Sequence, residues 1–123
     1  TLGDRKVGYI NAHGTSTPVG DVGEIEAVRR VFGAGDTPPV SSTKSMTGHS
    51  QGATGAQEAI YCLLMLEHDF IAPSINVETL DPALDAAEIA TQRIDNAGLD
   101  TVMTNSFGFG GTNGSMLISK FQG

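Results

Sequence analysis

Three segments of this sequence bring together residues that could stabilise a negative charge. They contain two histidines, one lysine and several glycines, and they read His13-Gly14-Thr15-Ser16-Thr17, Lys44-Ser45-Met46-Thr47-Gly48-His49 and Asn105-Ser106-Phe107-Gly108-Phe109-Gly110-Gly111-Thr112-Asn113. Ring and backbone N–H groups that converge on a carbonyl oxygen can stabilise the negative charge that develops there. If the segments meet at one site, they predict a site that stabilises an anion.

The residue types alone leave other interpretations open. Either histidine could be an ordinary loop or core residue, and the glycine-rich segment could be only a turn, since its glycines follow no phosphate-binding pattern. A metal site is a further interpretation. It has little support, because His13 and His49 have no third ligand at local spacing.

The elements that would position these segments can be predicted from periodicity. Beta-prone runs predict strands at residues 6–11, 40–43, 101–105 and 115–119, and apolar residues every three or four positions predict an amphipathic helix over 21–32. Residues 44–50, 72–100 and 106–114 are expected to form loops or turns. The order β-α-β-α-β-β predicts an α/β domain with a mixed sheet, and each chemical segment follows a strand, where α/β folds bind ligands.

The ends of the first helix carry recognisable signals. Asp21 can cap its start, with Glu24 three residues later, and Gly33 can end it.

The second helix, predicted over residues 57–67, is apolar on every side. A helix of this kind must be covered all round, so it belongs at the centre of a larger body. A chain of 123 residues offers little material to wrap it. Together with the lack of a starting methionine, this favours a fragment that expects a partner half.

Composition excludes several classes of function. The net charge is −7, and the seven basic residues form no stripe that could neutralise phosphates, so no nucleic-acid partner is expected. No apolar run reaches about 18 residues, so no membrane partner is expected either. The one cysteine, Cys62, cannot form an internal disulfide and fits a reducing cytoplasm, which is the expected location.

The motifs at residues 11–21, 43–49 and 105–113 resemble, in order and spacing, the C-terminal motifs of β-ketoacyl-(acyl-carrier-protein) synthases. Residues 63–68 and 71–76 are most similar to the type I bacterial enzymes, and Ser50 points the same way. The resemblance implies that residues 1–123 are an incomplete C-terminal domain: a partial thiolase-like α/β half-domain with a mixed sheet and a central buried helix. It also implies that the N-terminal half, with the nucleophilic cysteine, is absent, and that the complete enzyme is a homodimer.

The reaction implied by the resemblance is a decarboxylative Claisen condensation of an acyl thioester with malonyl-acyl carrier protein, in fatty acid elongation. His13 and His49 would donate hydrogen bonds to the enolate oxygen. Lys44 would hold the orientation and field of His49, and Glu58 would pair with Lys44, because a buried carboxylate without a partner is costly. Glu58 could instead cap its helix or face water.

Further roles come from the same resemblance. The backbone N–H of Phe109 would form half of the acyl oxyanion hole, and its ring would gate the acyl pocket. Thr15, Thr17 and Phe107 would contact substrate, the two threonines through the pantetheine arm. Some members of the family hold a structural cation near positions that match Asn11, Glu58 and Asn105. No cofactor is expected, because the substrates are carried on the phosphopantetheine of the acyl carrier protein.

Cys62 is not expected to be the nucleophile. It lies in the middle of the apolar helix, where neither a helix N-terminus nor a cationic neighbour can stabilise a thiolate.

Two other functions remain open. The chain could be a catalytically inactive fragment or a module that binds acyl or pantetheine groups without turnover. It could also belong to the ketosynthase of a polyketide pathway, although Ser16-Thr17-Pro18 argues mildly against this.

Overall fold

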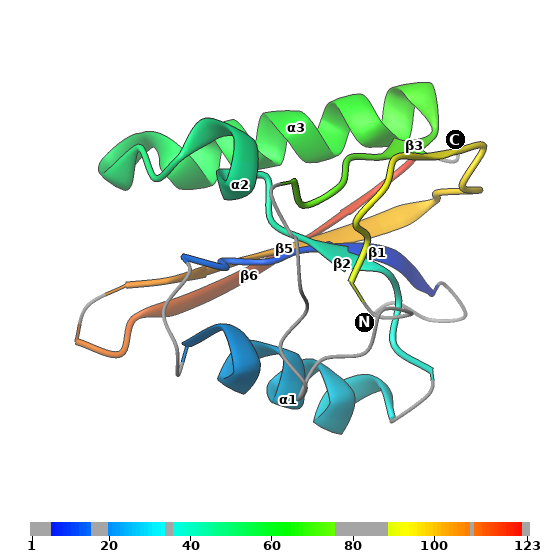
Figure 1. The fold of residues 1–123 in the computed structure, drawn as a ribbon. Coiled ribbons are helices and arrows are strands. Elements are labelled where there is room, and N and C mark those ends of the chain that lie inside the picture. Colours follow the sequence, from blue (N-terminus) through cyan, green and yellow to red (C-terminus); the bar gives the residue numbers. More distant parts are fainter. Residues whose placement is uncertain (1–5, 16–19, 34–35, 76–88, 109, 122–123) are drawn as a thin grey trace.

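A four-stranded sheet forms the middle layer of the structure, a computed structural model that describes residues 6–15, 20–33, 36–75, 89–108 and 110–121 (Figure 1). The strand order is β2-β1-β5-β6. The strands are β1 (Val7–Asn11), β2 (Val40–Ser41), β5 (Thr101–Phe107) and β6 (Asn113–Ser119). β1 pairs in parallel with β2 and β5, while β5 and β6 pair antiparallel, so the sheet is mixed, as predicted.

One helix packs on each face of this sheet, which gives three layers (Figure 1). α1 (Gly20–Phe32) buries Ile25 and Val28 against Ile10 and Val40. α3 (Thr54–His68) lies on the opposite face. Neighbouring strand residues point to opposite faces, so Ile10 meets α1 while Tyr9 meets α3.

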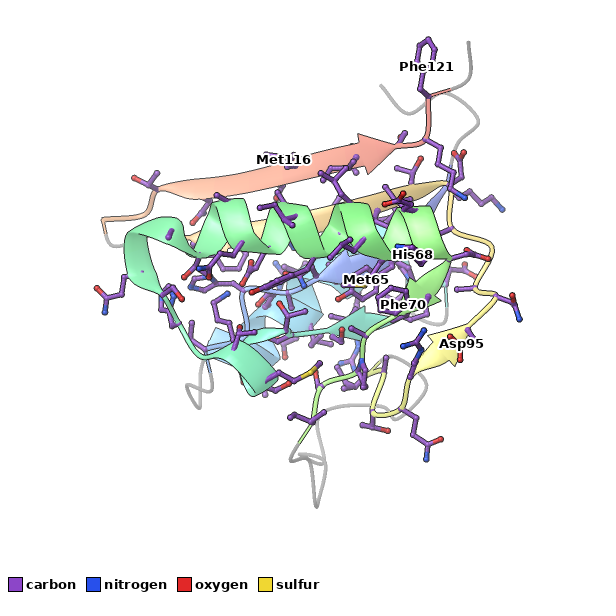
Figure 2. The ribbon with its side chains drawn as sticks, turned by 90° about the horizontal axis from the view of Figure 1, so that it is seen from above. Met65, His68, Phe70, Asp95, Met116 and Phe121 are labelled. Atoms are coloured by element: carbon purple, nitrogen blue, oxygen red, sulfur yellow. The ribbon has the colours of Figure 1, made fainter. Side chains whose placement is uncertain are left out.

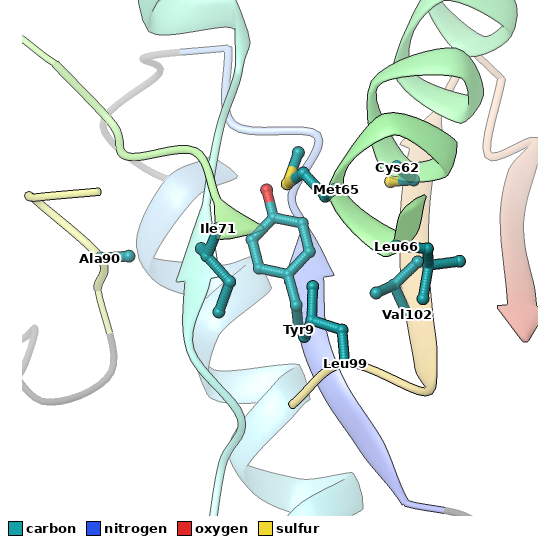
Figure 3. Packing of buried hydrophobic residues seen from close by; sticks show 8 residues of the cluster. All are labelled: Tyr9, Cys62, Met65, Leu66, Ile71, Ala90, Leu99 and Val102. Atoms are coloured by element: carbon teal, nitrogen blue, oxygen red, sulfur yellow. The ribbon is translucent and has the colours of Figure 1, made fainter. Parts of the chain in front are cut away.

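The larger core lies between α3 and the sheet. Figure 3 shows its eight buried residues around the Tyr9 ring: Tyr9, Cys62, Met65, Leu66, Ile71, Ala90, Leu99 and Val102. Cys62, Met65 and Leu66 recur at the three- and four-residue spacing of one helical face. This face is the one through which α3 docks on the sheet.

The outer face of α3 is apolar and exposed. Ile60, Leu63 and Leu64 are 54%, 52% and 43% exposed, and Met116 on the edge strand β6 is 53% exposed (Figure 2). The helix is apolar on all sides, as its sequence predicts, but the described residues cover only the face that packs on the sheet.

Several boundaries differ from the sequence-based expectation. The segment expected to be a loop after β2 begins with a short helix, α2 (Lys44–Thr47), and a 3-10 turn, η1 (Gln51–Ala53), leads into α3 three residues before the predicted start. One helical turn is too short to give a periodic signal. Residues 72–100 are not only loop, because a small ribbon pairs β3 (Phe70–Ile71) with β4 (Ile94–Asp95).

The hairpin turn is also shorter than predicted. β5 and β6 pair in register as far as Phe107 and Asn113, so residues 106–107 and 113–114 are strand rather than turn. The ladder extends because each added pair satisfies backbone groups, which outweighs the low strand propensity of serine, asparagine and glycine.

No helix in the described residues is long and apolar enough to cross a membrane.

Candidate active site

The three segments meet at one edge of the sheet, as predicted from their position after strands. The rings of His13 and His49 lie with centroids 5.7 Å apart and almost perpendicular, at 87°. Phe107, at the end of β5, packs edge-on against His13 with centroids 5.4 Å apart. Because β1, β2 and β5 are parallel, their carboxyl ends share this edge and bring residues far apart in sequence into contact.

The backbone of the His13 segment is held by Glu24 of α1. Its carboxylate accepts the backbone N–H of His13 at 2.8 Å and that of Gly14 at 3.0 Å. The Asn105 side chain on β5 also acts on this carboxylate and lowers its pKa. Glu24 is 6% exposed, and burial raises its pKa against the lowering effect of these donors. Glu24 therefore links α1 to the segment after β1, rather than forming the capping box expected at the start of α1.

Gly14 allows the close approach of the next segment. Its φ of +39° favours glycine, and a Cβ at this position would lie 2.8 Å from the Cβ of Ser42. The Ser42 hydroxyl donates a hydrogen bond to the Gly14 carbonyl at 3.1 Å. The segments after β1 and β2 are thus in direct contact.

Lys44 and Glu58 form a buried ion pair between α2 and α3. The Lys44 ammonium contacts Glu58 Oε1, and the side chains are only 4% and 1% exposed. Burial raises the pKa of Glu58, while Lys44 opposes the shift by stabilising the carboxylate. Glu58 thus neither caps the start of its helix nor faces water.

His49 is held through one ring nitrogen. Its Nδ1 lies 2.9 Å from the hydroxyl of Thr54, at the start of α3, and accepts the backbone N–H of Gln51 at 3.3 Å. Both contacts come from the chain just after His49, so the turn into α3 fixes the orientation of the ring.

The electrostatic environment keeps His13 neutral at neutral pH. Burial lowers its pKa below the ordinary value of 6.5, and the nearby Lys44 and His49 lower it further. Its Nδ1 is buried and has no hydrogen-bond partner among the described residues. A neutral imidazole still carries one N–H, so it can donate a hydrogen bond without bringing a full charge.

A buried polar network connects the strands that carry the site. The Asn11 amide donates to the Tyr9 hydroxyl at 3.3 Å, Tyr9 lies 2.7 Å from Ser41 Oγ, and Ser41 donates to the Ala72 carbonyl at 2.6 Å. Since the single Ser41 proton goes to Ala72, the Tyr9 hydroxyl donates to Ser41. This network joins β1, β2 and the segment after β3, and burial strongly raises the pKa of Tyr9.

The remaining predicted residues are placed as follows. Thr15 is half-buried in the segment after β1, whereas Thr17 and Phe109 lie outside the described residues. Of the positions named for a structural cation, Asn11 Oδ1 accepts the Thr104 hydroxyl and Asn105 Oδ1 accepts the Ser115 hydroxyl.

The third position is Glu58, whose Oε2 is buried and lacks a hydrogen-bond partner among the residues described. That orphan oxygen would suit a cation, and the cation remains a prediction.

Cys62 lies in the core on the sheet-facing side of α3 and is fully buried. Burial, and secondarily the nearby Glu58, raises the pKa of its thiol to about 12. A thiol in this state is a poor nucleophile at neutral pH.

Two residues that contact the site were not singled out from the sequence as site residues. Glu24 is a carboxylate on the same helical face as the buried Ile25 and Val28, which is an unusual position for a charge and was the available signal. Thr54 gave no comparable signal, because its contact with His49 depends on the turn between them.

The family of this chain is shown by comparison with known proteins. Residues 1–78 match the model of the C-terminal domain of β-ketoacyl synthases. The chain is 62% identical over 120 residues to 3-oxoacyl-[acyl-carrier-protein] synthase 1 of Haemophilus influenzae, which covers 98% of this chain and 29% of that protein. The chain thus spans less than a third of this relative.

Solved structures agree with this fold. A β-ketoacyl synthase from Burkholderia phymatum aligns with a TM-score of 0.85 and 39% identity, covering 94% of this chain and 28% of that one. A type II polyketide ketosynthase in complex with its acyl carrier protein aligns with a TM-score of 0.83 and 34% identity, again over 94% and 28%. The three-layer arrangement of this chain is therefore part of a thiolase-like ketosynthase fold. The chain belongs to the β-ketoacyl synthase family, as a partial half-domain with the C-terminal motifs.

Proposed function

We propose that this chain supplies the decarboxylation site of a 3-oxoacyl-(acyl-carrier-protein) synthase that acts in fatty acid elongation. The observation that carries the proposal is the contact between the His13 and His49 rings, beside the buried Lys44–Glu58 pair. Membership of the β-ketoacyl synthase family and the high identity to a 3-oxoacyl synthase 1 support the same function.

The chemistry begins with a malonyl thioester. Its bond to the carboxylate breaks, CO₂ leaves, and the electron pair of that bond becomes an enolate with its charge on the thioester oxygen. Ring N–H groups of His13 and His49 donate hydrogen bonds to this oxygen. Donors fixed before the charge develops need no reorganisation during the reaction, which is the main advantage of such a site.

Carbon–carbon bond formation follows. The enolate carbon attacks the carbonyl of an acyl group held as a thioester on a cysteine, and the cysteine leaves as a thiolate. That cysteine would come from the N-terminal half of the same synthase, because Cys62 is buried with a raised pKa. The backbone N–H of Phe109 would stabilise the oxyanion formed on the acyl group.

Lys44 and Glu58 act on the histidines rather than on substrate. Their burial favours a fixed pair, and the positive charge of Lys44 contributes to the lowered pKa of His13. Thr15, Thr17 and Phe107 would contact the pantetheine arm or the acyl chain.

The complete enzyme is proposed to be a cytoplasmic homodimer that needs no cofactor of its own. Its substrates arrive on an acyl carrier protein, and the complex of a ketosynthase relative with its own carrier protein supports this partner.

The test uses the complete synthase that contains this segment. His13→Ala and His49→Ala are each expected to reduce malonyl decarboxylation about 10²- to 10³-fold, the usual effect of losing one oxyanion donor. Mass spectrometry should still detect the acyl-enzyme in both variants. Decarboxylation at the unmodified rate in both variants would contradict the proposal, and so would a complete protein that neither decarboxylates malonyl thioester nor forms an acyl-enzyme.

A further inference from the structure

The hydrogen bonds at His49 have a defined direction. The backbone N–H of Gln51 can only donate, and it points at His49 Nδ1 at 3.3 Å. That nitrogen must therefore offer its lone pair, and a neutral imidazole then carries its proton on Nε2. Since Nδ1 has no proton to give, the hydroxyl of Thr54 donates as well, at 2.9 Å.

Thr54 makes the shorter and better placed of these two contacts. Thr54 is buried, with 6% of the residue exposed, and it is the first residue of α3, where the helix backbone limits its movement. His49, by contrast, lies on an exposed segment between Gly48 and the 3-10 turn. The contact thus anchors an exposed ring to a rigid element.

We propose that Thr54 is a positioning residue for the decarboxylation step: its hydroxyl fixes the orientation of His49 and holds the ring proton on Nε2. This inference rests on the proposed function, since it assumes that His49 donates a hydrogen bond to the enolate. Without the hydroxyl, the longer bond from Gln51 alone orients the ring, and the Nδ1–H tautomer becomes accessible. That tautomer has no proton on the nitrogen that would face the enolate.

The test compares Thr54→Val, which keeps the shape and removes the hydroxyl, with Thr54→Ser, which keeps the hydroxyl. Both are made in the complete synthase. Thr54→Val is expected to lower kcat for malonyl decarboxylation about threefold to tenfold, the loss that follows from one net hydrogen bond. KM and the rate of acyl-enzyme formation should change little, and Thr54→Ser should restore kcat to within about twofold of the unmodified enzyme.

Thr101→Val is the matched control. Thr101 is also a buried threonine, and its hydroxyl bonds to Ser119 at 2.7 Å, but it begins β5 at the opposite edge of the sheet from the histidines. It is expected to lower thermal stability without lowering kcat. A role of Thr54 that was only structural would give the same pattern as Thr101→Val.

The outcomes separate the two proposals. If the unmodified enzyme decarboxylates and His49→Ala does not, while Thr54→Val keeps full kcat, the role of Thr54 is overturned and the proposed function stands. If His49→Ala keeps full activity, the role of Thr54 fails with it, and if His13→Ala keeps full activity as well, the proposed function itself fails.

Nitrogen-15 NMR of ring-labelled histidine provides a test that needs no stable Thr54 variant. At a pH where the ring is neutral, the His49 resonances should show an unprotonated Nδ1 and a protonated Nε2. A proton on Nδ1 of the neutral ring would overturn the inference, whatever the variants do.

Discussion

The carboxylate of Glu24 on α1 accepts the backbone N–H of His13 at 2.8 Å, so a helix on one face of the sheet holds the backbone of a candidate catalytic residue at its edge. The same carboxylate accepts the backbone N–H of Gly14 at 3.0 Å. The position of His13 therefore depends on the packing of α1 as well as on the segment that carries it.

Replacement of Glu24 by glutamine should loosen this arrangement. A glutamine offers one oxygen, and its NH₂ group would face a backbone N–H that it cannot satisfy, at a cost of about 1–3 kcal/mol in the free energy of unfolding. The complete synthase with Glu24→Gln should unfold at lower urea concentration and decarboxylate more slowly. Glu26→Gln, on the exposed side of the same helix, is the control and should change neither. Equal stability of the two variants would show that the Glu24 bonds do not matter.

For the buried Lys44–Glu58 pair, removing one partner should cost more stability than removing both. Glu58→Leu leaves the Lys44 ammonium buried without a partner and is expected to cost about 3–5 kcal/mol in the free energy of unfolding. The double variant Lys44→Met with Glu58→Leu should cost clearly less, because no charge remains buried.

A surface ion pair gives the comparison. Asp95→Ala removes the exposed partner of Arg93, 2.8 Å away, and should cost no more than about 1 kcal/mol. Urea unfolding of the three variants measures the difference. A double variant as unstable as Glu58→Leu would mean that the charge is not the reason for the loss.

The lowered pKa of His13 predicts how the stability of the protein depends on pH. Burial, with Lys44 and His49, lowers this pKa below 6.5, so the ring stays neutral until the pH falls below the ordinary histidine range. Since the folded value is lower than the unfolded one, the contribution of His13 to stability is complete above pH 6.5. It is lost as the pH falls through the folded value. Proton NMR titration of the His13 ring, assigned with His13→Asn, measures this, and a midpoint at or above 6.5 would contradict it.

Cys62 should be chemically inert in the folded protein. Because burial raises its pKa to about 12, almost no thiolate exists at pH 8, and iodoacetamide should not label it. Peptide mass mapping distinguishes it from other cysteines of the complete synthase, and labelling after denaturation is the positive control. Cys62→Ala should still form the acyl-enzyme. Rapid labelling of the folded protein at Cys62 would show that the helix opens far more readily than its packing indicates.

The sequence predicts those features of the fold that depend on local patterns. The periodicity of Ile25 and Val28 marks α1, and the β-prone run around Tyr9 marks β1. The order of elements then places the three segments at one sheet edge, where His13 and His49 meet.

Other features depend on tertiary contacts and have no local signal. The capping pattern at Glu24 predicts a partner within α1, but the carboxylate bonds to His13 in the segment between β1 and α1. α2 and the β3–β4 ribbon are too short for periodicity to detect. The hydroxyl of Thr54 reaches His49 only because the 3-10 turn folds the chain back between them.

The exposed apolar face of α3 has a consequence for the order of folding. Ile60, Leu63 and Leu64 are not covered by the part of the chain that the structure describes, and the ribosome makes a C-terminal domain after the rest of the protein. In the complete synthase proposed above, an N-terminal half that covered this face would be synthesised first and could fold before α3 emerges, because domains fold as units during synthesis. The interval during which these side chains can capture other nascent chains is then short. The same segment synthesised alone would leave these apolar side chains exposed after it folds. Its time in solution would then be limited by aggregation with its own copies.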